Sequence, residues 1–204
     1  MLLFQKSKLV VLIIFLLVIN TVVFAQNGIN ATTFYKHDKY LSSDKMEGRF
    51  PGTKQNNKAA KYIKNHFKKF GLNKFNKNYY QSFKLFVKPD INKMKSDTVA
   101  TQNVVGYFEG SDSELKKEFI VIGAHYDHWG WGGKGSGSKK KDTLAIHNGA
   151  DDNASGVAAL LSILEELSNS KMKPKRSIIF IAFSGEEAGL LGSKYFVDHL
   201  PIPK

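Results

Sequence analysis

Three stretches within residues 119–190 share one arrangement of apolar and polar positions. In each, an apolar run or a loop leads to a short cluster of His, Asp or Glu, and a glycine-containing turn follows. The runs FIVI at 119–122 and SIIFIAF at 177–183 are rich in Ile, Val and Phe, which is typical of buried strands. A carboxylate at the end of a buried strand loses hydration that a partner must replace. Three such clusters in one chain suggest that a cation is the shared partner.

A helix is predicted between the second cluster and the last apolar run. Over residues 154–168, apolar side chains recur at helical spacing and polar ones fall on the other side; the apolar positions are Val157, Leu160, Leu161, Leu164 and Leu167. A further helix is predicted over residues 190–200. This alternation of strand and helix predicts an α/β sandwich with helices on both faces of the sheet. The site should then lie at the carboxyl ends of the strands.

The front half of the chain adds another helix and two strands. The helix is predicted over residues 55–70, with Thr53 as its N-cap and Gly71 as the residue that ends it. Strands are predicted over residues 79–87 and 102–109, joined by a polar, lysine-rich hairpin loop at 89–101. These antiparallel strands make the predicted sheet mixed.

The first polar cluster is His125-Tyr126-Asp127. An imidazole nitrogen can bind a metal, and Asp127 lies two residues later, so both side chains point to the same side of an extended segment. A carboxylate in that place can fix the tautomer of a metal-binding histidine. A hydrogen-bonded His–Asp pair at the start of a loop accounts for the pattern equally well.

The second cluster, GADDNASG, places Asp151 and Asp152 just before the predicted helix. Acidic residues there can cap the helix, which accounts for one Asp better than for two. A carboxylate has two oxygens and can bridge two cations, which lie about 3.5–4 Å apart in paired-metal sites.

The third cluster contains Glu186 and Glu187 after the strand at 177–183. Adjacent side chains point different ways, so one Glu can bind a metal while the other acts as a general base. Taken alone, two acids at the start of a helix are better explained by the helix dipole. In series with the other two clusters, they favour a metal site.

The segments HYDH, GADDNASG and SGEEAGLLGS resemble, in this order, the signature segments of the co-catalytic di-zinc aminopeptidases, which form peptidase family M28. The resemblance implies that His125 binds one zinc, Asp152 bridges both ions and Glu187 binds the other. It implies that Glu186 is the general base and that Asp127 is the acid behind His125. It also implies a cis peptide bond after Asp152 and a three-layer α/β/α sandwich around a mixed sheet.

The sequence departs from the family pattern after Glu187. The family has five ligands, and the further Asp and His should follow the Glu pair; the candidates here, Asp198 and His199, fall within the predicted helix at 190–200. We therefore expect residues 26–204 to be the N-terminal part of a zinc metallopeptidase domain whose sandwich is incomplete at the C-terminal end. Two Zn²⁺ are expected in the complete enzyme. With two protein ligands per ion, one of them shared, the chain alone is expected to bind zinc weakly and to be inactive.

Other residues leave two interpretations open. Glu47 and Arg49 precede the turn at 51–52 and are expected either to line the cleft or, by preference, to form a salt-bridged structural pair. Trp129 and Trp131 lie in the loop that joins His125 to Asp152, where they would contact substrate or pack within the loop.

Residues 1–25 have the pattern of a signal peptide, with Lys6 and Lys8 in a basic start, an apolar core at 9–23 and Val23-Phe24-Ala25 before Gln26. The alternative is an uncleaved membrane anchor, but the apolar run is short for a full span. The chain has no Cys, so an exported protein of this sequence needs no disulfide. We expect a secreted or periplasmic protein with no stable membrane association after cleavage. The formal net charge of +12 comes from lysines spread along the chain, so no nucleic-acid partner is predicted. The sequence leaves the oligomeric state open.

The predicted function is that of an exported zinc-dependent metallopeptidase, most simply an aminopeptidase that takes peptide substrates. A histidine ligand favours zinc over magnesium, although manganese or cobalt could substitute. Glu186 would accept a proton from the attacking water and pass it to the leaving amine. Three alternatives stay open: a carboxypeptidase, a glutaminyl cyclase on the same scaffold, or a non-catalytic binding domain that lacks two metal ligands.

Overall fold

The structure, a computed structural model, describes residues 29–75, 77–87, 98–134, 136, 138–171 and 173–202. The chain divides into two compact units, Met1–Asn30 and Ala31–Lys204. Every element described below belongs to the second unit, and the predicted signal peptide at 1–25 lies outside the described residues. Within the described part of the chain, no helix combines the length and the apolar character needed to cross a bilayer.

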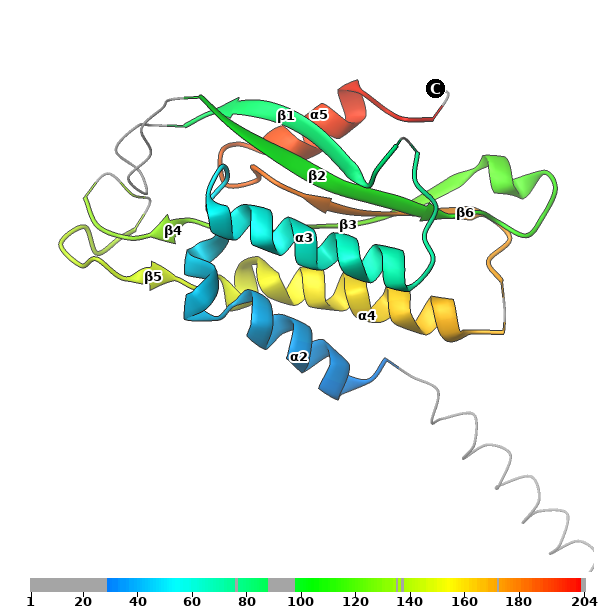
Figure 1. Ribbon diagram of the computed structural model, residues 1–204, viewed down its shortest axis with the longest axis horizontal. Coiled ribbons are helices and arrows are strands. Elements are labelled where there is room, and N and C mark those ends of the chain that lie inside the picture. Colours follow the sequence, from blue (N-terminus) through cyan, green and yellow to red (C-terminus); the bar gives the residue numbers. More distant parts are fainter. Residues whose placement is uncertain are drawn as a thin grey trace, which may run out of the picture. The chain divides into compact units, whose positions relative to one another are not determined.

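A mixed sheet of four strands forms the centre of the second unit (Figure 1). The strands are β1 (Tyr80–Phe86), β2 (Thr98–Phe108), β3 (Phe119–His125) and β6 (Ser177–Phe183), in the order β1-β2-β6-β3. β2 is antiparallel to both of its neighbours, and β3 is parallel to β6. The predicted α/β architecture with a mixed sheet is therefore confirmed.

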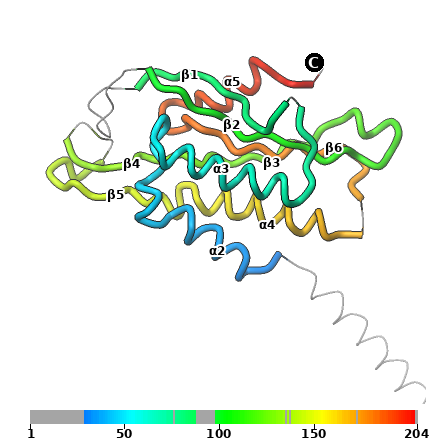
Figure 2. Tube along the Cα trace, in the orientation of Figure 1, coloured from blue at the N-terminus to red at the C-terminus, as the bar shows by residue number. Residues whose placement is uncertain are grey.

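Helices cover both faces of the sheet (Figures 1 and 2). α3 (Lys54–Lys69) and α4 (Ser155–Asn169) pack on one face, and α2 (Ala31–Leu41) lies against α4. α5 (Leu191–Asp198) packs on the other face, against β1 and β2. The layers match the predicted three-layer sandwich.

Each face of the sheet has its own apolar core. On the side of α3 and α4, fully buried side chains such as Ile63, Phe67, Leu161 and Phe180 form the larger cluster. On the side of α5, Phe196 packs with Ile179 and Ile181. β6 contributes to both clusters because it is an interior strand of the sheet, and its SIIFIAF run is buried as predicted.

β3 was also predicted to be a buried strand, but it is an edge strand of the described sheet. Ile120 and Val121 are 47% and 51% exposed, although their apolar run predicts burial on both faces. In the order of the described strands, β3 has a neighbour on one side alone.

Several boundaries also differ from the sequence-based expectations. β2 begins at Thr98, so the end of the predicted loop at 89–101 is strand, while residues 88–97 lie outside the described part. α2 and the two-residue strands β4 (Gly130–Trp131) and β5 (Ile146–His147) were not predicted. α3 matches its prediction closely, and the Thr53 side chain accepts a hydrogen bond from the Asn56 N–H as its N-cap.

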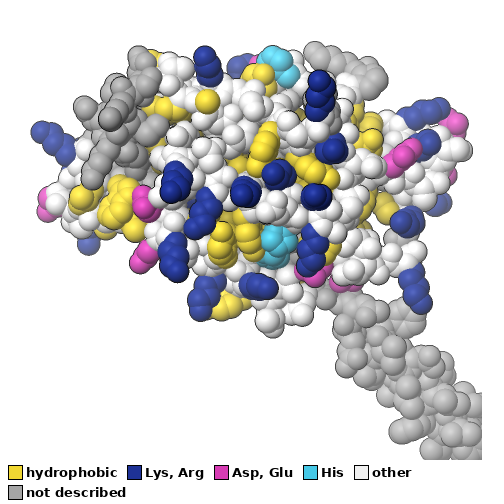
Figure 3. Space-filling view, viewed as in Figure 1, with side chains coloured by type: hydrophobic (Ala, Val, Ile, Leu, Met, Phe, Trp, Pro, Cys, Tyr) yellow, Lys and Arg dark blue, Asp and Glu magenta, His cyan; other side chains and the backbone are white. Residues whose placement is uncertain are grey.

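The basic side chains are scattered over the surface. Figure 3 shows lysines and arginines spread across the visible face among apolar and uncharged side chains, with no single basic stripe. That distribution agrees with the interpretation that the net charge is carried by solvated surface positions.

Candidate metal centre

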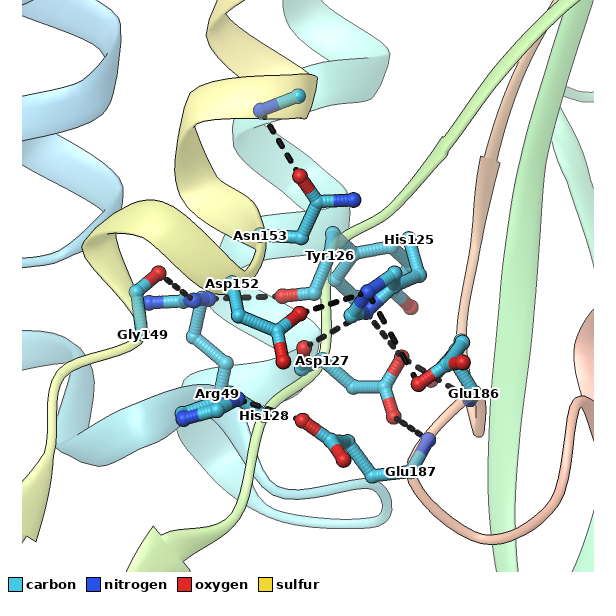
Figure 4. Close-up of polar contacts among 12 residues, drawn as sticks. Arg49, His125, Tyr126, Asp127, His128, Gly149, Asp152, Asn153, Glu186 and Glu187 are labelled. Carbon is cyan, nitrogen blue, oxygen red and sulfur yellow. Dashed lines mark hydrogen bonds and ion pairs between the residues drawn. The ribbon is translucent and has the colours of Figure 1, made fainter.

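The three predicted clusters meet at one edge of the sheet (Figure 4). β3 and β6 are parallel, with His125 opposite Phe183, so the chain leaves both strands at the same edge. An irregular turn, Ala150–Ala154, leads into α4 beside them and brings Asp152 to the same place. The fold therefore assembles residues that are up to 62 positions apart, from His125 to Glu187, into one group.

Asp152 lies at the centre of the group. Its Oδ1 is 3.0 Å from the Nε2 atom of His125, and a carboxylate oxygen of Glu186 is 3.8 Å from the same nitrogen. The Asp152 side chain is 63% exposed, so it faces open space rather than the protein core. This placement agrees with the expected position of a bridging carboxylate, and the ligand roles themselves stay predictions.

The neighbours of Asp152 also agree with expectation. Asp151 is exposed and is not among the residues whose ligand atoms converge. The peptide bond between Asp152 and Asn153 is cis, as the family resemblance implies. The Asn153 side chain turns to the helix and accepts a hydrogen bond from the Gly156 N–H at 3.0 Å.

His128 joins the group, although no role was predicted for it. Its Nδ1 atom donates to Oε1 of Glu187 at 2.6 Å, and the two side chains are 11% and 10% exposed. One ligand atom each of His128, Asp152 and Glu187 lie within 4.8 Å of one another. The signal was present as the second histidine of HYDH, but periodicity could not show that it turns toward Glu187.

The Asp127 carboxylate lies near His125, as expected, but it makes no hydrogen bond to the ring. The Nδ1 atom of His125 lies 3.2 Å from the backbone carbonyl of Asp127, whereas the carboxylate is 3.8 Å away. The carboxylate instead accepts hydrogen bonds from the backbone N–H groups of Glu186 and Glu187, at 3.3 and 3.4 Å. A fully buried carboxylate needs donors for its oxygens, and the loop after β6 supplies them.

Asp127 thereby links the first cluster to the third. Burial raises the pKa of its carboxyl to about 6, and the nearby His125 and the two N–H donors act against that rise. The residue holds the loop that carries both glutamates and its own carbonyl orients His125. These contacts make Asp127 a positioning residue.

Arg49 links the first cluster to the second. It is fully buried, and its guanidinium donates to the carbonyls of Tyr126 at 2.7 Å and Gly149 at 3.0 Å, as well as to those of Asn148 and Leu41. Burial lowers the pKa of Arg49 to about 10, so the group is still charged at neutral pH, and Asp127 opposes that shift. The expected structural role is thus observed, with backbone carbonyls in place of a salt-bridge partner.

A buried polar network holds the loop after β6 that carries Glu186 and Glu187. The Asn103 side chain accepts from the Ser184 N–H at 3.1 Å and donates to the Gly192 carbonyl at 2.8 Å. The Ser184 hydroxyl also contacts Thr101 at 2.7 Å and Asn56 at 3.3 Å. Because the loop is fixed at both ends, Glu186 and Glu187 project from a defined backbone.

Gly149 allows the second cluster to pack against His128. The residue has φ of +59°, and a Cβ atom there would lie 2.6 Å from the His128 ring and 2.5 Å from the Asp152 carbonyl. A side chain at this position would therefore push the ring or the loop away.

The downstream candidates Asp198 and His199 do not join the group. Asp198 pairs with Lys194 at 3.1 Å, and the His199 ring stacks on Tyr195 with its Nδ1 atom 3.0 Å from the Tyr195 carbonyl. His199 also lines a separate cavity of about 310 Å³ whose lining contains no acidic residue. Their place at the end of α5 explains this, since α5 packs on the other face of the sheet.

Trp129 and Trp131 were expected either to contact substrate or to pack within the loop, and the structure gives Trp131 a packing contact. Trp131 donates from its ring nitrogen to the Glu47 carboxylate at 3.3 Å, which is packing within the protein rather than free exposure to a cleft.

Comparison with known sequences agrees with the geometry. The family model for "Peptidase family M28" matches residues 103–204, which is half of the chain. The chain belongs to peptidase family M28. Among curated M28 relatives, aminopeptidase YwaD of Bacillus subtilis is 32% identical over 109 residues, which covers 53% of this chain and 20% of that protein. The chain thus spans about a fifth of the length of this relative.

Solved structures show the same M28 fold. A Zn-dependent exopeptidase from Parabacteroides distasonis is similar with a TM-score of 0.59 and 19% identity, over 86% of this chain and 57% of that one. Glutaminyl cyclase from Tannerella forsythia is similar with a TM-score of 0.57 and 22% identity, over 77% and 47%. At these identities the likeness concerns the fold, and the family assignment places the chain among zinc-dependent peptidases.

Proposed function

We propose that this protein is an exported zinc-dependent aminopeptidase that removes N-terminal residues from peptides. The observation that carries the proposal is the convergence of His125, Asp152, Glu186 and Glu187 at one edge of the sheet. Membership of peptidase family M28 supports the reaction class, and the similarity to aminopeptidase YwaD supports the choice of an aminopeptidase.

The donor atoms of the group fit zinc. Imidazole nitrogens and carboxylate oxygens are both zinc ligands, and the ligand atoms of His128, Asp152 and Glu187 are already within 4.8 Å of one another. Two imidazoles and two carboxylates lie in contact here, and Asp152 is largely exposed. A divalent cation stabilises a group of this composition. We propose that the active enzyme binds two Zn²⁺, and that His125, Asp152 and Glu187 would hold them.

Zinc in this place would polarise the scissile carbonyl and make a water molecule more acidic. The chain's own contribution is the placement of a base. Glu186 is 33% exposed on its side chain, and its backbone N–H is fixed by Asp127, so its carboxylate is both accessible and oriented. Glu186 accepts the proton of the attacking water and delivers it to the leaving amine.

A glutaminyl cyclase is the second candidate function. The observation that favours it is the structural likeness to the glutaminyl cyclase of Tannerella forsythia. A cyclase closes an N-terminal glutamine on itself and releases ammonia, whereas an aminopeptidase releases a free amino acid. The two functions can therefore be separated by their products.

The test uses peptides with free and with blocked N-termini. For the active enzyme with zinc present, we expect release of the N-terminal amino acid from a leucyl peptide, no release from its N-acetyl form, and loss of release with a chelator. Release of the C-terminal residue from both peptides, or ammonia from an N-terminal glutamine without free amino acid, would overturn the aminopeptidase proposal.

Export is proposed from the leader pattern at residues 1–25. Mass spectrometry of the protein purified from its natural source should find a mature chain that begins near Gln26. A chain that retains Met1 and stays in the cytoplasm would contradict export.

A further inference from the structure

We propose that the outer face of α3 docks on an anionic phospholipid bilayer and holds the protein reversibly at a membrane surface. The proposal goes beyond the peptidase function, because it concerns where the protein acts and uses no residue of the metal centre. It starts from residues 48–89, which contain ten lysines, one arginine and no Asp or Glu. Lysines occur along the whole chain, but elsewhere acids offset them, so this segment carries a formal charge of +11 out of +12.

α3 places all of its lysines on the side that faces solvent. The buried residues of the helix fall on one side of it; they are Asn56, Ala59, Ala60, Ile63 and Phe67. The lysines fall on the other side, and all are exposed except Lys64, which is half-buried; they are Lys54, Lys58, Lys61, Lys64, Lys68 and Lys69. At 1.5 Å per residue, the face is ~21 Å long from Lys54 to Lys68.

The lysines of α3 form no ion pair with a carboxylate of the described residues. In that part of the chain, the lysines that do form ion pairs are Lys116, Lys117 and Lys194, which lie outside α3. Figure 3 has α3 across its middle, where dark blue side chains are spread, while the magenta ones lie toward the margins of the view. Ammonium groups without carboxylate partners create a positive potential that attracts an anionic surface.

Aromatic rings join this face to the neighbouring elements. The ammonium group of Lys58 lies 5.9 Å from the ring centroid of Tyr40, which belongs to α2. That of Lys64 lies 5.3 Å from the ring centroid of Tyr80, at the start of β1. These cation–π contacts hold two of the lysines in place and make one surface of three elements.

β1 adds an exposed apolar side chain to the surface. Phe83 and Leu85 are buried in the apolar cluster on the side of α5. Alternate side chains of a strand point to opposite faces, so Lys84 and Phe86 point to the side of α3. Phe86 is 66% exposed. An aromatic ring beside lysines is typical of surfaces that insert among lipid headgroups.

The arrangement favours a bilayer over a nucleic acid. The lysines lie on both sides of the helix axis, and they do not form the stripe or groove that tracks a phosphate backbone. Tyr40 and Tyr80 are partly buried and each has an ammonium group over its ring, so they offer no free platform on which bases could stack. A bilayer presents its charge in a plane, where each nearby lysine contributes about fivefold to binding.

The experiment measures, by sedimentation, how the full chain partitions between solution and lipid vesicles in about 0.1 M salt. One set of vesicles is phosphatidylcholine alone, and in the other roughly a third of the lipid is phosphatidylglycerol. The ratio of the two partition coefficients is the preference for anionic lipid. Residues 1–25 are apolar and are present in every variant, so the ratio removes their contribution. The wild type should show a preference of more than about 100-fold.

The test variant changes three lysines along the middle of the face together, Lys54→Gln, Lys61→Gln and Lys68→Gln. It should lower the preference about 100-fold, at fivefold per lysine. Arginine at the same three positions keeps the charge and should keep the preference. Lys61→Glu repeats the test with one substitution and should lower the preference about 25-fold, because it changes the charge by two. Circular dichroism shows that each variant is folded.

The matched control removes the same charge from another part of the surface. Lys139, Lys140 and Lys141 are consecutive and exposed, and their change to Gln should leave the preference within about threefold of the wild-type value. Raising the salt to about 1 M, where the Debye length is about 3 Å, should abolish the preference of the wild type.

Equal losses in the α3 variant and the control would overturn the proposal, because net charge rather than the α3 face would then cause the binding. A wild type that binds both kinds of vesicle equally, or folded α3 variants that keep the preference, would also overturn it. A DNA duplex that removes the protein from anionic vesicles at a lower phosphate concentration than that of the lipid would show that the face binds nucleic acid instead.

Discussion

The molecule contains two groups of histidines whose surroundings are opposite. At the edge of the sheet, His125 and His128 lie against carboxylates, with distances of 3.0 Å to Asp152 and 2.6 Å to Glu187. Between α2 and α3, His37 and His66 lie against aromatic rings, with 4.8 Å between their own centroids. The Tyr62 hydroxyl is 2.7 Å from the Nδ1 atom of His37.

Burial, with help from nearby positive charges, keeps the histidines of the second group neutral. Burial, together with the charges of His66, Lys36 and Lys69, lowers the pKa of His37 to about 4. His37 is 3% exposed, and burial also lowers the pKa of His66. The comparison teaches that the neighbours of an imidazole, rather than the residue itself, decide whether it can serve a cation or belongs to a core.

The largest expected effect comes from changing Glu186, the proposed general base. In active protein, Glu186→Gln should lower turnover by roughly 10²–10⁴-fold, because the amide cannot accept a proton. Zinc content should stay at the wild-type level, since the proposed ligands are unchanged. Steady-state kinetics on an aminoacyl p-nitroanilide, with metal analysis of the same sample, provides the test. Near-wild-type turnover would show that Glu186 is not the base.

Arg49 connects the two regions, since it donates to the Leu41 carbonyl at the end of α2 and to the Tyr126 and Gly149 carbonyls of the site. Arg49→Met should lower the free energy of unfolding by roughly 3–5 kcal/mol, because the buried carbonyls that the guanidinium binds lose their donor. Urea unfolding measures this.

The matched control is Arg176→Met, which removes an exposed ion pair with Glu118 at 2.6 Å. The control should change stability by no more than about 1 kcal/mol. Equal effects in the two variants would show that Arg49 does not hold the loops.

The pH dependence of stability separates the two histidine groups. The folded-state pKa of His37, about 4, is below its unfolded value. Its contribution to stability is therefore present above about pH 6.5 and is lost as pH falls toward about 4, because the unfolded chain binds the proton first. Asp127 acts in the opposite direction, since its carboxyl has a raised folded-state pKa of about 6.

A comparison of wild type with His37→Gln cancels the contribution of Asp127. Between pH 7.5 and pH 5, the wild type should lose roughly 1–2 kcal/mol more stability than the variant. Urea unfolding in EDTA at both pH values gives the difference. Parallel pH profiles for the two proteins would mean that His37 is not held neutral by the fold.

The smallest expected effect sharpens the separation of fold from site. Thr53→Ala removes the N-cap of α3, which carries Tyr62 and His66 far along the chain from the carboxylate clusters. The variant should lose about 1 kcal/mol of stability and keep its zinc affinity. Thermal unfolding and zinc competition on one preparation check both. A tenfold loss of zinc affinity would show that the cap also holds the site, through the contact of Asn56 with Ser184.

Much of the fold could be predicted because its signals are local. The buried run of β6, the Thr53 cap and the stripe of α4 all act over a few residues. α2 escaped detection because its buried residues are His37 and Leu41, which do not make an apolar stripe. β4 and β5 have two residues each, too few for any alternation to appear.

The site could be predicted as far as its clusters, but not as far as its contacts. His125, Asp152 and Glu187 stand in recognisable segments, and the parallel register of β3 and β6 brings them together. The positions of His128 and of the Asp127 carboxylate depend on how the loops after those strands turn. Arg49 and Gly149 fix those turns, and the hydrogen bond between them spans 100 positions of the chain. No local sequence pattern can predict such a contact.

The most direct test of the metal centre is the zinc-dependent stability of wild type and Asp152→Asn. Zinc that binds only the folded chain should raise its stability by about 2.7 kcal/mol at 100 times the dissociation constant. The melting temperature of the wild type should therefore rise when zinc replaces EDTA, and the rise should be almost absent in Asp152→Asn, whose central carboxylate has become an amide. His37→Gln should keep the full rise. An equal rise in wild type and Asp152→Asn would contradict the assignment of Asp152 as the centre of a metal site.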